Sequence, residues 1–300
     1  MILKKIVFTF IISLMSIGIF AQKSMPVTGE NKKGKIVTKI DDFKSIQNNG
    51  PFDITYKTSK DSAGYIVIYG KSNIIDKIDI DNSNGVLTLK FPQNIKLKNE
   101  RIKIALYSSN INTVNINGSG NLNIPEELTT NELLVNLRGS GNLRCPQITC
   151  KRLNVNILGS GDVSFDANTI DTEISIMGSG DVKISNLEAK NTSLSVKGSG
   201  DINCRSLNCD NLSISSTGSG DIMVAGRTKN ARYESKGSGD IIAGNMNASI
   251  INAKTVGSGD INCYAEDAIE TVSLGSGDIR YRGNPVVTTT TRGSGSVKKL

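Results

Sequence analysis

One tripeptide, Gly-Ser-Gly, recurs ten times from residue 118 onward and constrains the fold of this chain more than any other feature. Successive copies begin 18 to 21 residues apart, and each is followed by Asn, Asp or Ser and then by an aliphatic residue. The copies begin at Gly118, Gly139, Gly159, Gly178, Gly198, Gly218, Gly237, Gly257, Gly275 and Gly293. A repeat of this near-constant length indicates stacked units, each too small to bury an apolar core alone.

Within each repeat, apolar and polar residues alternate, which is the pattern of strands with one buried face. For example, Ile202 and Cys204 alternate with Asn203 and Arg205. Stacked coils bury such apolar rows as ladders, with successive coils about 4.8 Å apart. The sequence therefore predicts an all-β solenoid of about ten coils of 18–21 residues. A meander or sandwich is the alternative, but neither requires the same tripeptide in every turn.

The two glycines in every turn predict either a positive φ or a close approach of stacked backbones, because glycine tolerates both at low cost. Between them stand Ser119, Ser140, Ser160, Ser179, Ser199, Ser219, Ser238, Ser258, Ser276 and Ser294. No histidine is present to act as the base for a serine nucleophile. We therefore interpret these serines as a ladder of hydrogen-bonded hydroxyls.

Seven aspartates occupy the position after the tripeptide and would stack as a column. They are Asp162, Asp181, Asp201, Asp221, Asp240, Asp260 and Asp278. Neighbouring carboxylates in such a column repel by about 1 kcal/mol per pair in water, so some interaction must offset the repulsion. We favour carboxylates that accept backbone N–H groups of their own turn. A row of Ca²⁺ sites is the alternative, but uncharged Asn121, Asn142 and Ser296 at the same position favour the turn role.

The five cysteines fall at two positions of the repeat. Cys145, Cys204 and Cys263 lie six residues after the first glycine, and Cys150 and Cys209 lie eleven after it. Because another repeat has Ile and Ala there, the thiols are expected to point into the core. Spacing and export permit the disulfides Cys145–Cys150 and Cys204–Cys209. Free buried thiols are the favoured interpretation, and Cys263 lacks a partner in either case.

The N-terminus has the pattern of a secretory signal peptide over residues 1–21. Lys4 and Lys5 precede an apolar run from Ile6 to Phe20, which is too short for a comfortable membrane span. An uncleaved N-terminal anchor is the alternative. We expect a flexible leader over 22–35 and one solenoid domain over 36–300, with irregular N-terminal coils at 36–117 and regular repeats at 118–297. No transmembrane span is expected after signal cleavage.

The composition argues against nucleic-acid binding and against common catalytic chemistry. The formal charge is +7, and two of those charges leave with the signal peptide. Basic clusters near residues 32–35 and 96–103 lack the aromatic residues that single-strand binders use for stacking, so they are interpreted as solvated faces. The absence of His removes the commonest general base and a common metal ligand. No catalytic residue and no cofactor is predicted.

The repeats, together with the entry segment containing Phe43, Ile46, residues 50–52 and Ile54, carry a family resemblance. The chain resembles, over residues 36 to 297, exported proteins best known from Bacteroidetes and described as auto-transporter adhesins with a head GIN domain. The resemblance implies a single-stranded right-handed β-helix and a place in the periplasm or on the outer cell surface of a Gram-negative bacterium. This chain has more repeats than a typical member.

Three classes of function remain open. The favoured one is an exported binding or adhesion module of the cell envelope, whose ligand is a glycan or a protein. The second is a structural element that assembles with itself as a homo-oligomer. The third is a polysaccharide-active enzyme, which the short repeats disfavour because they leave no long insertions to build a cleft, and because the uniform carboxylates offer no pair in contrasting environments.

Overall fold

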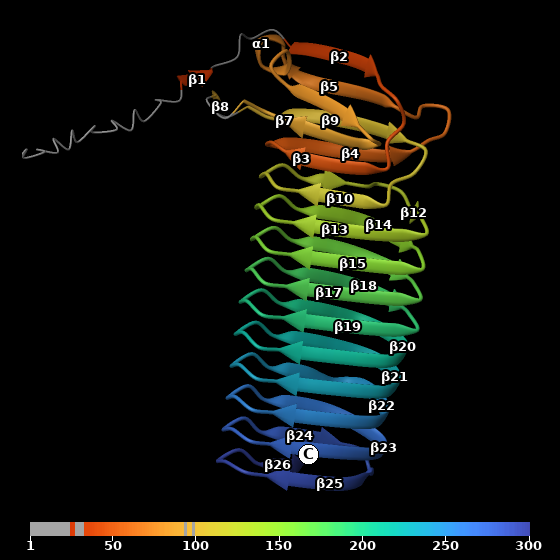
Figure 1. Ribbon diagram of the computed structural model, residues 1–300. Helices are drawn as coiled ribbons and strands as arrows, with labels where there is room; N and C mark the ends of the chain where they lie inside the picture. Colours follow the sequence, from red (N-terminus) through yellow and green to blue (C-terminus); the bar gives the residue numbers. More distant parts are fainter. Residues whose placement is uncertain (1–24, 28–32, 93–94, 98–99) are drawn as a thin grey trace, which may run out of the picture.

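The computed structural model describes residues 25–27, 33–92, 95–97 and 100–300, and it confirms the predicted solenoid. The chain winds right-handed through about nine turns (Figure 1), so the number of turns is slightly below the ten expected from the tripeptides. The segment expected to be a signal peptide and most of the expected leader lie outside the described residues. Within the described residues, no helix is long and apolar enough to span a membrane.

Each coil contributes one strand to each of two faces. The front sheet holds β3 (Ser45–Asn49), β7 (Val86–Lys90), β10 (Thr113–Ile116), β13 (Glu132–Leu137), β15 (Arg152–Ile157), β17 (Asp171–Ile176), β19 (Asn191–Val196) and β25 (Val286–Thr291). From β10 onward, these strands precede the Gly-Ser-Gly turns. The back sheet holds β4 (Phe52–Thr58), β9 (Ile102–Ser108), β11 (Leu122–Asn123), β12 (Leu128–Thr129), β14 (Leu143–Thr149), β16 (Val163–Asn168), β18 (Val182–Glu188), β24 (Ile279–Arg282) and β26 (Val297–Lys299). Four long strands pass through both faces: β20 (Ile202–Ser216), β21 (Ile222–Ser235), β22 (Ile241–Thr255) and β23 (Ile261–Ser273).

Successive coils pair in parallel with equivalent residues opposite each other, which is why the repeat length varies so little. Leu122 pairs with Ile54 on one side and with Leu143 on the other. The same inward position then continues through Val163, Val182, Ile202, Ile222, Ile241, Ile261 and Ile279, all of which are buried. The core is therefore a set of aliphatic ladders between the two sheets.

An irregular cap covers the first coil, in the region where the repeats are absent (Figure 1). Its strands are β2 (Lys33–Lys39), β5 (Tyr65–Lys71) and β6 (Asp79–Ser83). β5 pairs antiparallel with both β2 and β9, and β6 pairs antiparallel with β7. The short helix α1 (Ser72–Ile75) packs beside β2 and β5. The short strands β1 (Met25–Val27) and β8 (Ile95–Leu97) pair with each other. Residues 33–35, which the sequence analysis assigned to the leader, belong to β2. Lysines on β2, such as Lys35 over the Tyr69 ring at 5.6 Å, discourage pairing at this edge.

Tyr233 places an aromatic ring among the aliphatic ladders of the later coils. Tyr233 is completely buried, and its hydroxyl has no hydrogen-bond partner in the structure. The next coil has alanine at three buried positions, Ala243, Ala248 and Ala253, which leaves room for the ring. Burial raises the pKa of Tyr233, so the phenol stays protonated. The ring fits the core, but its hydroxyl costs free energy.

We expect Tyr233→Phe to stabilise the protein, because it removes a buried hydroxyl that has lost its water without gaining a partner. The expected gain in the free energy of unfolding is about 1 kcal/mol in urea titration. Tyr56→Phe is the matched control with the opposite sign, because the buried Tyr56 hydroxyl lies 2.9 Å from Ser108 Oγ. A loss of stability in Tyr233→Phe would show that the hydroxyl is satisfied in solution.

Candidate functional site

The Gly-Ser-Gly turns stack so tightly that they exclude side chains at both glycines. A Cβ added to Gly200 would lie 2.0 Å from the carbonyl oxygen of Gly180 in the preceding coil. Gly198 meets the oxygen of Gly178 at the same distance. Of the two explanations predicted for these glycines, close approach is therefore correct. Positive φ is wrong for the turns, with the exception of Gly293 at 142°.

The serines of these turns do not form the predicted hydroxyl ladder. All ten are exposed, and within the described residues none of their hydroxyls is bonded to another part of the chain. The backbone N–H groups of most of these serines instead hold the turns together: Ser219 N donates to Gly198 O at 2.9 Å, and seven other turns repeat this contact. The side chain faces solvent because the narrow turn leaves no other direction for it.

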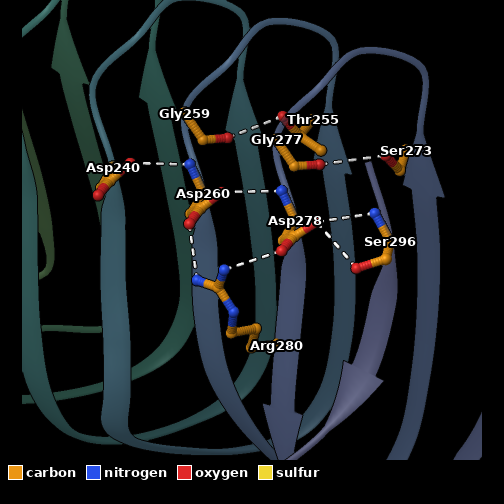
Figure 2. Close-up of polar contacts among 9 residues, drawn as sticks. All are labelled: Asp240, Thr255, Gly259, Asp260, Ser273, Gly277, Asp278, Arg280 and Ser296. Carbon is orange, nitrogen blue, oxygen red and sulfur yellow. Dashed lines mark hydrogen bonds and ion pairs between the residues drawn. The ribbon is translucent and has the colours of Figure 1, made fainter. Parts of the chain in front are cut away.

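A ladder of buried hydroxyls does exist, two residues before the tripeptide and only in the later coils. Ser216, Ser235, Thr255 and Ser273 are completely buried. Each donates to the carbonyl of the second turn glycine, for example Thr255 to Gly259 at 2.9 Å (Figure 2). The five coils before them carry Ile, Leu or Val at this position, and in the first coil Asn48 Nδ2 makes the equivalent bond to Phe52 O at 3.0 Å. These hydroxyls therefore hold the turn in place from inside the core of the solenoid.

The aspartates form the expected column, but their hydrogen bonds run between coils and not within one turn (Figure 2). Asp240 Oδ1 accepts the backbone N–H of Asp260 at 2.8 Å, and Asp260 Oδ1 accepts that of Asp278 at 2.8 Å. The same contact links every aspartate of the column to the next. The structural role is therefore right in kind, and the prediction of bonds within the same turn is wrong. Each bond helps to offset the repulsion between stacked carboxylates.

The column also begins earlier than the tripeptides indicate. Asn121 donates its backbone N–H and its Nδ2 to Asp53 Oδ1, at 3.3 and 2.8 Å. Asp53 was missed because its turn reads Gly50-Pro51-Phe52 in place of Gly-Ser-Gly. The spacing Gly50, Phe52, Asp53, Ile54 nevertheless matches the repeat position by position, and a search for Gly followed three residues later by Asp-Ile would have found it.

At the C-terminal end, an arginine bridges two rungs of the column. Arg280 donates to Asp260 at 2.6 Å and to Asp278 at 2.8 Å (Figure 2). The backbone and hydroxyl of Ser296 bond Asp278 Oδ1, and these bonds lower the pKa of Asp278. Among the described residues, no cluster of three Cys, Asp or Glu could hold a metal ion. A row of calcium sites along the column remains an untested alternative.

All five cysteines are free thiols in the structure, so neither Cys145–Cys150 nor Cys204–Cys209 is formed in it. Cys145, Cys150, Cys204 and Cys263 are buried, as the repeat positions predict, and Cys209 is half-buried. Burial raises the pKa to about 11 for Cys145 and to about 12 for Cys204 and Cys263. Thiols with such pKa values are protonated at neutral pH and react slowly.

We expect the folded protein to react slowly with Ellman's reagent at pH 8, because little thiolate is present and the core excludes the reagent. Cys209 should react first, since it is the least buried of the five. After denaturation without a reductant, all five thiols should titrate. A single reactive thiol after denaturation would instead indicate that the two disulfides form during export, with Cys263 left over.

The front sheet carries a hollow of about 620 Å³ that extends over several coils from β15 to β22. Its floor includes the short side chains of Ser193 and Ser213, at equivalent positions in adjacent coils. The longer Glu173 and Arg232 occupy that position in the flanking coils. The hollow therefore arises because small residues lie between large ones on an otherwise regular sheet.

One side of this hollow is a ladder of amides. Asn191 Nδ2 donates to Asp171 Oδ1 at 2.8 Å, Asn211 to Asn191 at 2.9 Å, and Asn230 to Asn211 at 3.1 Å. Ile250, which is 52% exposed, occupies the next position after Asn230 and ends the ladder of amides. This ladder was not predicted, although Asn recurs seven residues before three successive tripeptides. The surface offers fixed amide and hydroxyl groups for hydrogen bonding.

A family model described as "Putative auto-transporter adhesin, head GIN domain" matches residues 42–206 and 188–285. No curated protein matches the chain. The matches together reach from the first full coil to the end of β24, so they cover most of the solenoid.

The chain is similar in fold to solved structures from Parabacteroides. One is described as a "putative lipid binding protein" from Parabacteroides distasonis ATCC 8503, with 24% identity, a TM-score of 0.55, and coverage of 92% of this chain and 100% of that chain. A "putative adhesin" from Parabacteroides merdae ATCC 43184 has 24% identity, a TM-score of 0.55, and coverage of 92% and 99%. Another "putative adhesin" from P. distasonis has 20% identity, a TM-score of 0.51, and coverage of 92% and 100%. At these identities the likeness establishes a shared fold.

Proposed function

This chain belongs to the family described as "Putative auto-transporter adhesin, head GIN domain", and from that premise we propose that it is an exported, non-enzymatic binding module of the cell envelope. The proposal includes export by a signal peptide over residues 1–21, to the periplasm or the outer surface. The ligand is a glycan or a protein that contacts the front sheet.

The observation that carries the proposal is the hollow on the front sheet. The backbone beneath it is held by parallel pairing on both sides, so Ser193, Ser213 and the ladder of Asn191, Asn211 and Asn230 keep fixed positions. Fixed hydrogen-bonding groups lose little entropy when a ligand binds. Each amide also has a second N–H that the ladder does not use. A polar ligand such as a glycan could form hydrogen bonds with several coils at once.

Filling the hollow tests the proposal. We expect Ser193→Tyr/Ser213→Tyr to fold normally, because tyrosine suits an exposed strand position, and to lose at least about tenfold in affinity, since the rings would occupy the ligand space. The matched control is Ser199→Tyr/Ser219→Tyr, which makes the same changes in exposed turns of adjacent coils. Binding is measured to an array of purified polysaccharides and extracellular-matrix proteins. If the wild type binds nothing on the array, or if the front-sheet variant and the turn variant bind the ligand with equal affinity, the front sheet is not the binding face.

The location is tested separately, by protease treatment of intact cells followed by detection of the chain. Loss of the chain would support adhesion at the outer surface. Protection until the outer membrane is opened would indicate a periplasmic protein. In that case the self-assembling structural role, which the long regular faces also suit, becomes the leading hypothesis.

A further inference from the structure

A second hollow lies on the back sheet, on the opposite face from the front-sheet hollow. Its volume is about 390 Å³, within the usual range of roughly 300–1,000 Å³ for small-molecule sites. It spans the coils of β20, β21 and β22, with Arg282 reaching into it from β24. The repeat explains its shape, because Ala225 and Gly244 replace longer side chains on the outer surface of two adjacent coils.

Gly244 has a specific role in this shape. A Cβ added at Gly244 would lie 3.1 Å from Arg282 Nη2, and no backbone atom lies as near. The glycine is not required by its backbone conformation, because its φ is not positive. Because glycine has no side chain, the Arg282 guanidinium can pack against the back sheet at the edge of the hollow.

The hollow has one apolar side and two cationic groups. Met223, which is 44% exposed, and the half-buried Ile242 occupy equivalent positions of adjacent coils. Arg205 and Arg282 supply the charge, and none of the residues lining the hollow is acidic. Among the described residues, neither arginine forms an ion pair, whereas Arg280 on the same strand as Arg282 is bonded to two aspartates.

Two guanidiniums without a counter-charge complement an oxyanion, since each can donate paired hydrogen bonds to it. A phosphate monoester carries close to two negative charges at neutral pH and matches both arginines, whereas a carboxylate carries one. Met223 and Ile242 would at the same time cover an apolar group attached to the phosphate. We propose that the back-sheet hollow binds a phosphate monoester that carries an apolar group, with Arg205 and Arg282 on the phosphate and Met223 and Ile242 on the apolar part.

The test uses the purified full chain and octyl phosphate in isothermal titration calorimetry. Octyl phosphate should bind at least tenfold more tightly than inorganic phosphate or octanol, because only octyl phosphate satisfies both sides of the hollow. Arg205→Gln/Arg282→Gln should weaken binding about a hundredfold, at about tenfold for each charge-assisted contact. Arg138→Gln/Arg144→Gln is the control, because it removes the same charge from exposed residues outside the hollow.

Gly244→Val gives an independent readout, because it fills the hollow without changing charge and should weaken binding at least tenfold. Equal affinity of the wild type and Arg205→Gln/Arg282→Gln would overturn the proposal. Equal affinity for octyl phosphate and inorganic phosphate would overturn its apolar part. Flotation with phosphatidylcholine vesicles, with and without phosphatidic acid, then distinguishes the source of the ligand. Flotation that requires phosphatidic acid and both arginines supports a membrane lipid, and octyl phosphate binding without flotation supports a soluble phosphate ester.

Discussion

Gly200→Ala should strongly destabilise the solenoid, although it adds only one methyl group. The new Cβ would lie 2.0 Å from the Gly180 carbonyl oxygen, more than 1 Å inside normal contact. Both atoms belong to stacked backbone, so no side chain can rotate away. The turn would have to shift, which would strain the bonds of Ser199 and Gly200 to Gly178 O, at 3.0 and 3.3 Å. We expect a loss of about 3 kcal/mol or more in the free energy of unfolding.

Gly244→Ala is the matched control for this prediction. Neither glycine has a positive φ, so neither substitution forces an alanine into the left-handed region. At Gly244 the added Cβ meets only the flexible end of Arg282, and we expect a change within about 0.5 kcal/mol. Urea unfolding followed by circular dichroism measures both variants. Similar losses in the two would mean that the entropy of glycine in the unfolded chain, and not the stacking of the turns, sets the cost.

The regular part of the fold could be predicted because a single physical constraint recurs in every coil. Close stacking demands glycine at Gly198 and Gly200, and the same demand at each turn makes the period visible in the sequence. Inward and outward positions alternate along each strand. The buried cysteines could therefore be placed from their distance to the tripeptide. Residues 36–117 were recognised only as irregular N-terminal coils, because the antiparallel pairings of β2, β5 and β6 follow no repeat.

The candidate sites were harder to predict, because they depend on contacts between coils. From the sequence, the Asp201 carboxylate could be assigned a backbone N–H donor, but not whether that donor belongs to its own turn or to the next coil. The two hollows arise from small residues placed beside large ones, such as Ser213 beside Arg232 and Gly244 near Arg282. A small residue has no distinctive pattern of its own, so these surfaces emerge only when the coils are aligned in register.

The aspartate column predicts opposite results for two substitutions of Asp201. Asp201 Oδ1 accepts the backbone N–H of Asp221 at 2.8 Å. Asp201→Asn keeps that acceptor, as Asn142 does for Asp162 at 2.7 Å, and it removes one charge from a repelling row. We expect its free energy of unfolding to stay within about 0.5 kcal/mol of the wild type. Asp201→Leu removes the acceptor and should cost about 1–2 kcal/mol.

Salt and calcium separate the two explanations of this column. If the carboxylates are structural and repel one another, added NaCl should stabilise the wild type more than Asp201→Asn, because screening relieves a repulsion that the variant has already reduced. If the column binds Ca²⁺, the melting temperature should instead rise with CaCl₂, fall with a chelator, and respond less in Asp201→Asn. We expect the first result, since uncharged Asn121 and Asn142 continue the same ladder of bonds. Equal losses in Asp201→Asn and Asp201→Leu would contradict the acceptor role and show that the negative charge itself is needed.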